Sequence, residues 1–185
     1  MQTAVKNDFV SVQDYLAAEE ISDIRHEYLG GLVGAMAGET IAHNRIVGNL
    51  FFAIRTRLKD KSHRMYVIDI RVNFDLRGDE YFYYPDIVVT CDKNDTHPRF
   101  IRHPKLIIEV LSDSTERIDK REKFFAYTSI SSLEEYVLVA QNPREVTFYR
   151  RAGGWKAEKI SGAKAIASLQ SLKFSIPLSA IYEGV

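Results

Sequence analysis

The chain has 185 residues, enough for one domain with a sizeable buried core, which excludes a disulfide-stapled mini-protein. Its 25 Lys and Arg residues balance its 25 Asp and Glu residues, so no net charge draws it to nucleic acid or to an anionic membrane. The single cysteine, Cys91, excludes an intrachain disulfide and a zinc ribbon.

The N-terminal 40 residues predict a short helix and then a hairpin. Ser11 has the character of an N-cap before a helix that contains Tyr15, and we expect a peripheral element with Glu19 and Glu20 as its polar end. Glycines punctuate residues 24–38, which indicates two short strands joined by a tight turn. No signal-peptide core and no stretch of about 18 apolar residues is found, so we expect a cytoplasmic protein without a membrane span.

A long amphipathic helix is predicted from Thr40 onward. Its apolar stripe has steps of three and four residues, from Val47 through Leu50 and Ile54 to Leu58. Four residues before Val47 the same stripe reaches His43, which therefore points toward the protein. Both a buried structural histidine and a site residue fit this position.

Three segments with strand character follow, at residues 65–75, 81–91 and 105–112, and we expect them to form a meander. Ser114 and Thr115 are expected to cap a helix that runs to about Ser129, and a further strand covers 134–140. A hairpin that turns at Gly153 and Gly154 and a short helix near Pro177 complete the chain. The order indicates one mixed α/β (α+β) domain over residues 1–185, with added hairpins.

Glu109 is the most informative residue because it interrupts an apolar strand, LIIEVL. A carboxylate there is costly unless it is ion-paired, binds a metal or is neutralised. Asp86 follows Pro85 at the start of the preceding apolar run, and acids on adjacent strands about 4.8 Å apart can share a cation. Oxygen ligands favour Mg²⁺ or Mn²⁺ over zinc.

Together these residues resemble the PD-(D/E)XK nuclease superfamily and, more closely, its restriction-endonuclease-like Uma-two family, abundant in cyanobacteria. The resemblance covers roughly residues 12–151 and rests on Arg25-His26-Glu27-Tyr28, Met36-Ala37-Gly38, His43-Asn44, Tyr84-Pro85-Asp86, Glu109-Val110-Leu111-Ser112 with Ser114-Thr115, Asp119 to Lys123 to Tyr127, and Glu135-Tyr136-Val137-Leu138-Val139. It implies an αβββαβ core with a mixed central sheet.

The resemblance also implies a metal site in which Asp86, Glu109 and the Val110 carbonyl bind Mg²⁺ or Mn²⁺. The superfamily places a lysine two residues after the glutamate, where this chain has Leu111. A lysine from the following helix is the expected replacement.

Lys123 is the first candidate, because Asp119, Lys123 and Tyr127 share one helix face, and Lys120 is the second. A solvated Asp119–Lys123 ion pair is the structural alternative. Glu27 is expected near the metal, and a surface pair of Glu27 with Arg25 is its alternative.

These features predict a metal-dependent endonuclease that hydrolyses phosphodiester bonds of DNA, with Asp86, Glu109 and Lys123 as catalytic residues. The alternative is a catalytically silent nuclease fold that binds nucleic acid or protein, which Leu111 favours. A hydrolase that uses His43 as a base lacks a nucleophile motif. Local basic clusters such as 55–64 and 99–105 could contact DNA, although zero net charge opposes tight nonspecific binding. Analogy with this fold suggests a homodimer.

Overall fold

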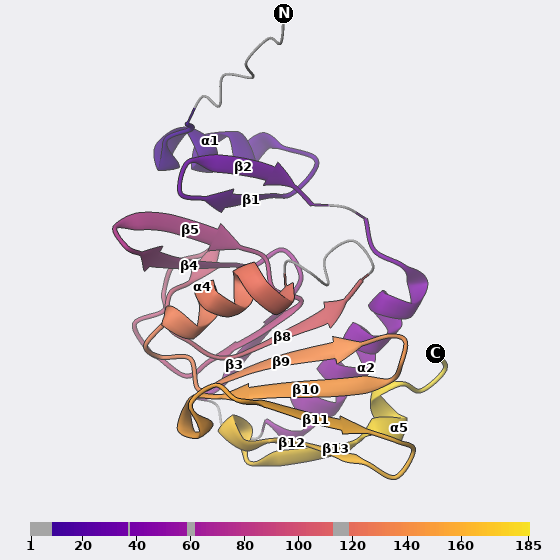
Figure 1. Cartoon of the computed structure of the whole chain (residues 1–185). Coiled ribbons are helices and arrows are strands. Elements are labelled where there is room, and N and C mark those ends of the chain that lie inside the picture. Colours follow the sequence, from indigo (N-terminus) through magenta and orange to yellow (C-terminus); the bar gives the residue numbers. More distant parts are fainter. Residues whose placement is uncertain (1–8, 37, 59–61, 113–118) are drawn as a thin grey trace, which may run out of the picture.

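The strands form three sheets in the computed structural model, which describes residues 9–36, 38–58, 62–112 and 119–185 (Figure 1). One sheet has the order β2-β1-β5-β4-β7 and consists of Leu32–Ala35, His26–Leu29, Asp79–Tyr83, Arg71–Leu76 and Phe100–Ile101. A second has the order β11-β10-β9-β8-β6-β3 and consists of Ala157–Ser161, Glu145–Arg150, Glu135–Ala140, Pro104–Leu111, Ile87–Thr90 and Arg64–Val67. The third pairs β12 (Ile166–Leu169) with β13 (Phe174–Pro177).

The helices are α1 (Val12–Ile21), α2 (Ile41–Arg57), α4 (Phe124–Ser129) and α5 (Leu178–Ile181). A π-helical turn, η1 (Asp119–Lys123), leads directly into α4, and two 3₁₀ turns are η2 (Arg151–Gly153) and η3 (Gln170–Leu172). The predicted caps Ser114 and Thr115 lie outside the described residues. Within the described part of the chain, no helix is long and apolar enough to cross a membrane.

The six-stranded sheet lies between α2 and α4, which cover its opposite faces (Figure 1). On one face of β8, Leu106, Ile108 and Val110 pack in the same apolar cluster as α2. On the other face, Ile107 and Leu111 pack in the same cluster as α4. The sheet is mixed, because β8 and β9 are parallel and the remaining pairs are antiparallel. β8 is therefore buried on both faces. The three predicted segments are neighbours in the expected order as β3-β6-β8, although β4 and β5, which come between β3 and β6 in the chain, belong to the other sheet.

The prediction of one strand over 65–75 and one over 81–91 was wrong. Each segment forms two strands, and the second strand lies in a different sheet from the first. The first segment bends at Ile68 and Asp69, whose φ angles are 49° and 59°, and the second bends at residues 84–86. The two bends are adjacent, since the Ile68 N–H donates to the Asp86 carbonyl over 3.2 Å. An antiparallel pair thus passes from one sheet into the other.

The predicted N-terminal helix and hairpin are confirmed. Ser11 is the N-cap of α1, and its hydroxyl oxygen accepts from the Asp14 N–H at 3.1 Å. The tight turn between β1 and β2 uses Gly30 and Gly31, with φ angles of 54° and 103° that disfavour side chains.

The expectation that α1 is merely peripheral was wrong. The Tyr15 ring is buried, with its centroid 5.0 Å from that of Tyr28 and 5.4 Å from that of Phe82. Glu19, expected at a polar end, is also buried and accepts a 2.8 Å hydrogen bond from the Tyr84 hydroxyl. The helix covers an aromatic face of the five-stranded sheet, so it belongs to the folded core.

Glu135 fastens the C-terminal region to the six-stranded sheet. It is 1% exposed, and its carboxylate accepts from Arg150 Nε at 2.8 Å and from the Ser171 hydroxyl at 2.8 Å. The main-chain N–H groups of Gln170 and Ser171 donate to it as well, at 3.3 and 3.1 Å. This acid, part of the family motif, therefore has a structural role.

Replacing Glu135 by Ala should lower the free energy of unfolding by ~3–5 kcal/mol, because it leaves Arg150 without its buried partner. The neighbouring Glu134→Ala variant is the control, since Glu134 is 51% exposed and pairs with Lys105 at the surface. It should lose no more than ~1 kcal/mol. Urea denaturation of both variants measures the difference, and equal losses would contradict the structural role of Glu135.

Candidate active site

The two predicted acids, Asp86 and Glu109, lie next to each other at the end of the ladder between β6 and β8. Asp86 lies in the link just before β6, and Glu109 projects from β8 toward α4. The Asp86 main-chain N–H donates to Glu109 Oε2 at 3.2 Å. The Val110 N–H in turn donates to Asp86 Oδ2 at 2.7 Å. The last paired residues of the ladder, Ile87 and Ile108, hold both acids in register.

Lys123 reaches the same point from η1. Its Nζ lies 3.2 Å from Glu109 Oε1, 3.0 Å from Glu27 Oε1 and 3.4 Å from Asp119 Oδ1. The side chains of Lys123 and Asp119 are only 7% and 3% exposed, so the alternative of a solvated ion pair was wrong. Lys120, the second candidate, is exposed.

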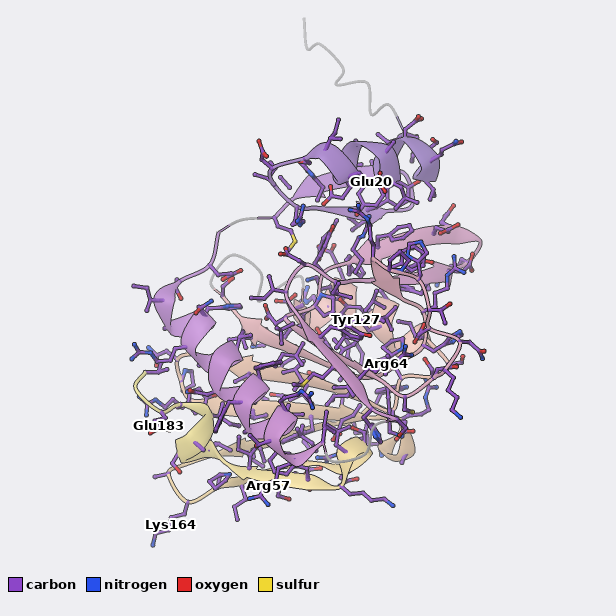
Figure 2. All side chains as sticks on the ribbon, turned by 180° about the vertical axis from the view of Figure 1, so that it is seen from behind. Glu20, Arg57, Arg64, Tyr127, Lys164 and Glu183 are labelled. Carbon is purple, nitrogen blue, oxygen red and sulfur yellow. The ribbon has the colours of Figure 1, made fainter. Side chains whose placement is uncertain are left out.

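Because Leu111 occupies the position on β8 where the superfamily has a lysine, the ammonium beside Glu109 comes from η1 instead. Leu111 lies two residues after Glu109, on the same face of β8, and its side chain packs in the apolar cluster of α4. The Tyr127 hydroxyl, one helical turn after Lys123, donates to Glu109 Oε1 at 3.2 Å. Figure 2 shows Tyr127 near the centre of the molecule. The predicted face of Asp119, Lys123 and Tyr127 thus converges on the acid of β8.

Glu27 joins the cluster from β1, in the other large sheet. Besides its contact with Lys123, its Oε1 accepts from the Tyr84 N–H at 3.3 Å. The alternative pair with Arg25 was wrong, because Arg25 Nε pairs with Asp69 at 3.1 Å. The cluster therefore includes carboxylates from both sheets.

His43 is both buried and part of the cluster. It lies in the first turn of α2, whose N-cap Thr40 accepts from the His43 N–H at 3.1 Å. The imidazole Nε2 is 3.2 Å from Asp86 Oδ2 and 3.8 Å from Glu39 Oε2. Burial alone would lower the His43 pKa, but its hydrogen bond to Asp86, the nearby Glu39 carboxylate and a hydrogen bond to the Val110 main chain raise it above its ordinary value.

The buried charges of the cluster are mostly negative. Burial raises the pKa of Glu109 well above its ordinary value; Lys123 opposes this, and the surrounding carboxylates add to it. Burial alone would lower the pKa of Lys123, but Glu109 and two other carboxylates raise it well above its ordinary value. Asp119 Oδ1 is buried and has no hydrogen-bond partner among the described residues, although it lies within ion-pair distance of Lys123 Nζ, at 3.4 Å. An additional cation would therefore be stabilised here.

The donor atoms fit Mg²⁺ or Mn²⁺. Among the described residues, no three His, Cys, Asp or Glu side chains converge as ligands of one metal ion. A cation would instead be held by Asp86, Glu109 and the Val110 carbonyl, which points to the edge of β8 where the Val110 N–H contacts Asp86. Mg²⁺ in proteins is commonly bound by one or two carboxylates and keeps several waters, which suits this set.

Sequence reasoning missed two features of the site. Glu39 lies one residue before the N-cap of α2 and four before His43, and this spacing could have placed it beside the imidazole. A cavity of about 290 Å³ opens next to Asp86, Glu39 and His43. The cavity forms between segments that are distant in sequence, so no local sequence pattern predicts it.

The fold and the lysine-centred carboxylate cluster define a restriction-endonuclease-like protein. The solved structures include a putative nuclease belonging to DUF820 from Anabaena variabilis that has the same fold, with a TM-score of 0.76 at 16% identity over 94% of this chain and 97% of that chain. Residues 12–179 match the Uma2 family, described as "Putative restriction endonuclease". The chain belongs to the Uma2 family.

Two relatives come from Synechocystis sp. The uncharacterized protein sll1609 is 28% identical over 178 residues, which cover 94% of this chain and 99% of the relative. The uncharacterized protein slr1290 is 30% identical over 179 residues, which cover 95% of this chain and 93% of the relative. The similarity therefore extends over nearly the whole length of each protein, and the predicted Uma-two resemblance is confirmed.

Replacing Lys123 by Met should lower the free energy of unfolding of the metal-free protein at pH 8 by ~3–5 kcal/mol, because it leaves buried carboxylates unpaired. The stability of this variant should also fall more steeply than that of the wild type as pH rises above the ordinary glutamate pKa of 4.5. The sign follows because raised carboxyl pKa values make the folded state bind more protons than the unfolded state. Denaturation at pH 5 and pH 8 measures both effects, with exposed Lys120→Met as control. Equal stability of the two variants would contradict the interpretation.

Proposed function

We propose that the chain is a metal-dependent endonuclease that hydrolyses phosphodiester bonds of DNA by a PD-(D/E)XK-type mechanism. The observation that carries this proposal is the 3.2 Å contact between Lys123 Nζ and Glu109 Oε1. This contact places an ammonium at Glu109, although the position two residues later, where the superfamily has a lysine, is occupied by Leu111. The match to a family of putative restriction endonucleases supports the same reaction class.

In the proposed reaction, Asp86, Glu109 and the Val110 carbonyl would hold a divalent cation, which would supply Lewis acidity toward the phosphodiester and a bound water. Lys123 orients the attacking water and offsets charge that develops on the scissile phosphate. Attack at phosphorus breaks the bond to the 3′ oxygen, which leaves a 5′-phosphate and a 3′-hydroxyl.

Two neighbours position the acids. The Tyr127 hydroxyl holds Glu109 Oε1, and the His43 imidazole holds Asp86 Oδ2. Each acid therefore keeps a fixed orientation, with one oxygen engaged by a side chain of the protein. Such preorganisation lowers the cost of reaching the transition state.

A catalytically silent binding module is the second candidate, and one observation favours it. The Lys123 ammonium is already within ion-pair distance of three carboxylates, so part of the negative charge is neutralised by the protein itself. Such a protein needs no metal. Metal binding therefore separates the two candidates.

Wild-type protein incubated with supercoiled plasmid should nick it in Mg²⁺ or Mn²⁺ and leave it intact in chelator. Asp86→Ala, Glu109→Ala and Lys123→Ala should each reduce nicking by at least ~10²-fold, because each removes a group that acts on the reacting phosphate. Gel electrophoresis measures the rates, and Glu134→Ala serves as a surface control. Wild-type activity in all three variants would overturn the assignment.

Mg²⁺ should stabilise the wild type by ~2.7 kcal/mol at about 100 times its Kd, because it binds the folded state. The Asp86→Asn and Glu109→Gln variants keep the shape of the side chains and should lose this stabilisation. Thermal unfolding with and without Mg²⁺ provides the measurement. If Mg²⁺ does not stabilise the wild type and the wild type cuts no plasmid, the protein is the catalytically silent binding module.

A further inference from the structure

The cavity beside Asp86 has the position of a substrate subsite. Its volume is about 290 Å³, just below the ~300–1,000 Å³ typical of small-molecule sites. It lies where the start of α2 meets the bend between β3 and β4, and Asp86 and His43 form part of its lining. A phosphate at the proposed catalytic residues would therefore have the cavity immediately to one side.

The walls of this cavity are suited to a flat apolar ring. Tyr84, Met36 and Ile68 line it. The Tyr84 ring is fixed because its hydroxyl donates to the buried Glu19, whereas Met36 and Ile68 are 39% and 48% exposed. Large apolar side chains exposed beside a cavity are typical of ligand sites.

The backbone at Ile68 adds a second, independent observation. Ile68 has a φ of 49°, which a β-branched residue rarely adopts, and its N–H donates to the carbonyl of Asp86. Strain of this kind collects at ligand and catalytic sites. The bend thus holds an apolar side chain at the cavity and is hydrogen-bonded to the residue that carries the proposed metal ligand.

The rest of the lining is mixed: it includes the carboxylates of Glu39, Asp69 and Asp86 as well as neutral and basic side chains. Asn44 offers an amide, which presents both a donor and an acceptor to the edge of a base. Arg25 also lines the cavity; its side chain is 40% exposed and pairs with Asp69, which is 60% exposed. A guanidinium in such a pair can exchange a surface carboxylate for a phosphate at little cost.

Three residues of the predicted basic clusters bind other groups of the protein. Arg102 Nε donates to Asn73 Oδ1 at 2.9 Å, and Lys105 Nζ pairs with Glu134 at 2.6 Å. Arg64 donates to main-chain carbonyls, one of them that of Asp95. With zero net charge as well, a broad footprint on duplex phosphates is disfavoured, and a local contact to one nucleotide is favoured.

We infer that this cavity receives an unpaired nucleobase next to the scissile phosphate, so that the substrate is DNA with an unpaired or extrahelical nucleotide at the cleavage site. This inference rests on the proposed nuclease function and names the class of its substrate. A base inside a duplex cannot enter the cavity, and extrusion costs least where the base is already unpaired.

The test is equilibrium binding, which reads the cavity without any cleavage. Three fluorescent duplexes of one sequence are compared by anisotropy in Ca²⁺ and in chelator: one fully paired, one with a central unpaired nucleotide, and one with an abasic residue at that position. The wild type should bind the second about 10-fold more tightly than the other two in at least one of these buffers, because stacking in a pocket is lost without the base.

Ile68→Ala should bring binding of the duplex with the unpaired nucleotide close to that of the paired duplex, because it takes away one wall of the cavity. Ile166→Ala is the matched control, since Ile166 is 60% exposed on β12 and does not line the cavity; it should keep the preference. Equal binding of all three duplexes by the wild type in both buffers, or an unchanged preference in Ile68→Ala, overturns the inference.

The two proposals fail separately. Metal-dependent nicking without a preference for the unpaired nucleotide would keep the nuclease and overturn the base site. A preference that Ile68→Ala abolishes, in a protein that cuts no DNA, would support the base site and overturn the nuclease.

Discussion

The rest of the site depends on the ion pairs that the buried ammonium of Lys123 makes with three carboxylates. β8 is covered on both faces, so the carboxylate of Glu109 can be buried only with a counter-charge. Leu111 cannot provide it, and the ammonium comes from η1. Because Lys123 also contacts Glu27 and Asp119, one cation fixes β1, β8 and the start of the α4 region relative to one another.

These site residues could be predicted because each stands out in its local sequence, either as a charge in an apolar segment or by its helical spacing. Glu109 is an acid within an apolar run, and Asp119, Lys123 and Tyr127 repeat at four-residue steps that survive the change from the expected α-helix to a π-helical turn. Asp86 was singled out because it follows Pro85 at the start of an apolar run, and the family motif then supported it. The N-terminal helix and hairpin, α2, and the strands β8 to β11 were predicted as well, since their periods are set by which side chains are buried.

What the sequence could not predict depends on contacts between distant segments. The alternating apolar pattern continues from Ile68 to Val72, so nothing local marks the first bend. Pro85 marks the second bend, but not the change of sheet that occurs there. Glu19 looks like a solvated helix end, and the approach of Tyr84 and His26 makes it a buried acceptor. The cavity beside Asp86 is likewise a product of the bend and the start of α2.

The bend between the sheets has a mechanical consequence. Glu27 belongs to one sheet and Glu109 to the other, and both bind the same nitrogen atom of Lys123. A rotation of one sheet against the other must lengthen at least one of these contacts, and it must turn Asp86, which lies in the link between them. The angle between the two sheets therefore sets the distances between the carboxylates of the site. Residues far from the site can change these distances by changing that angle.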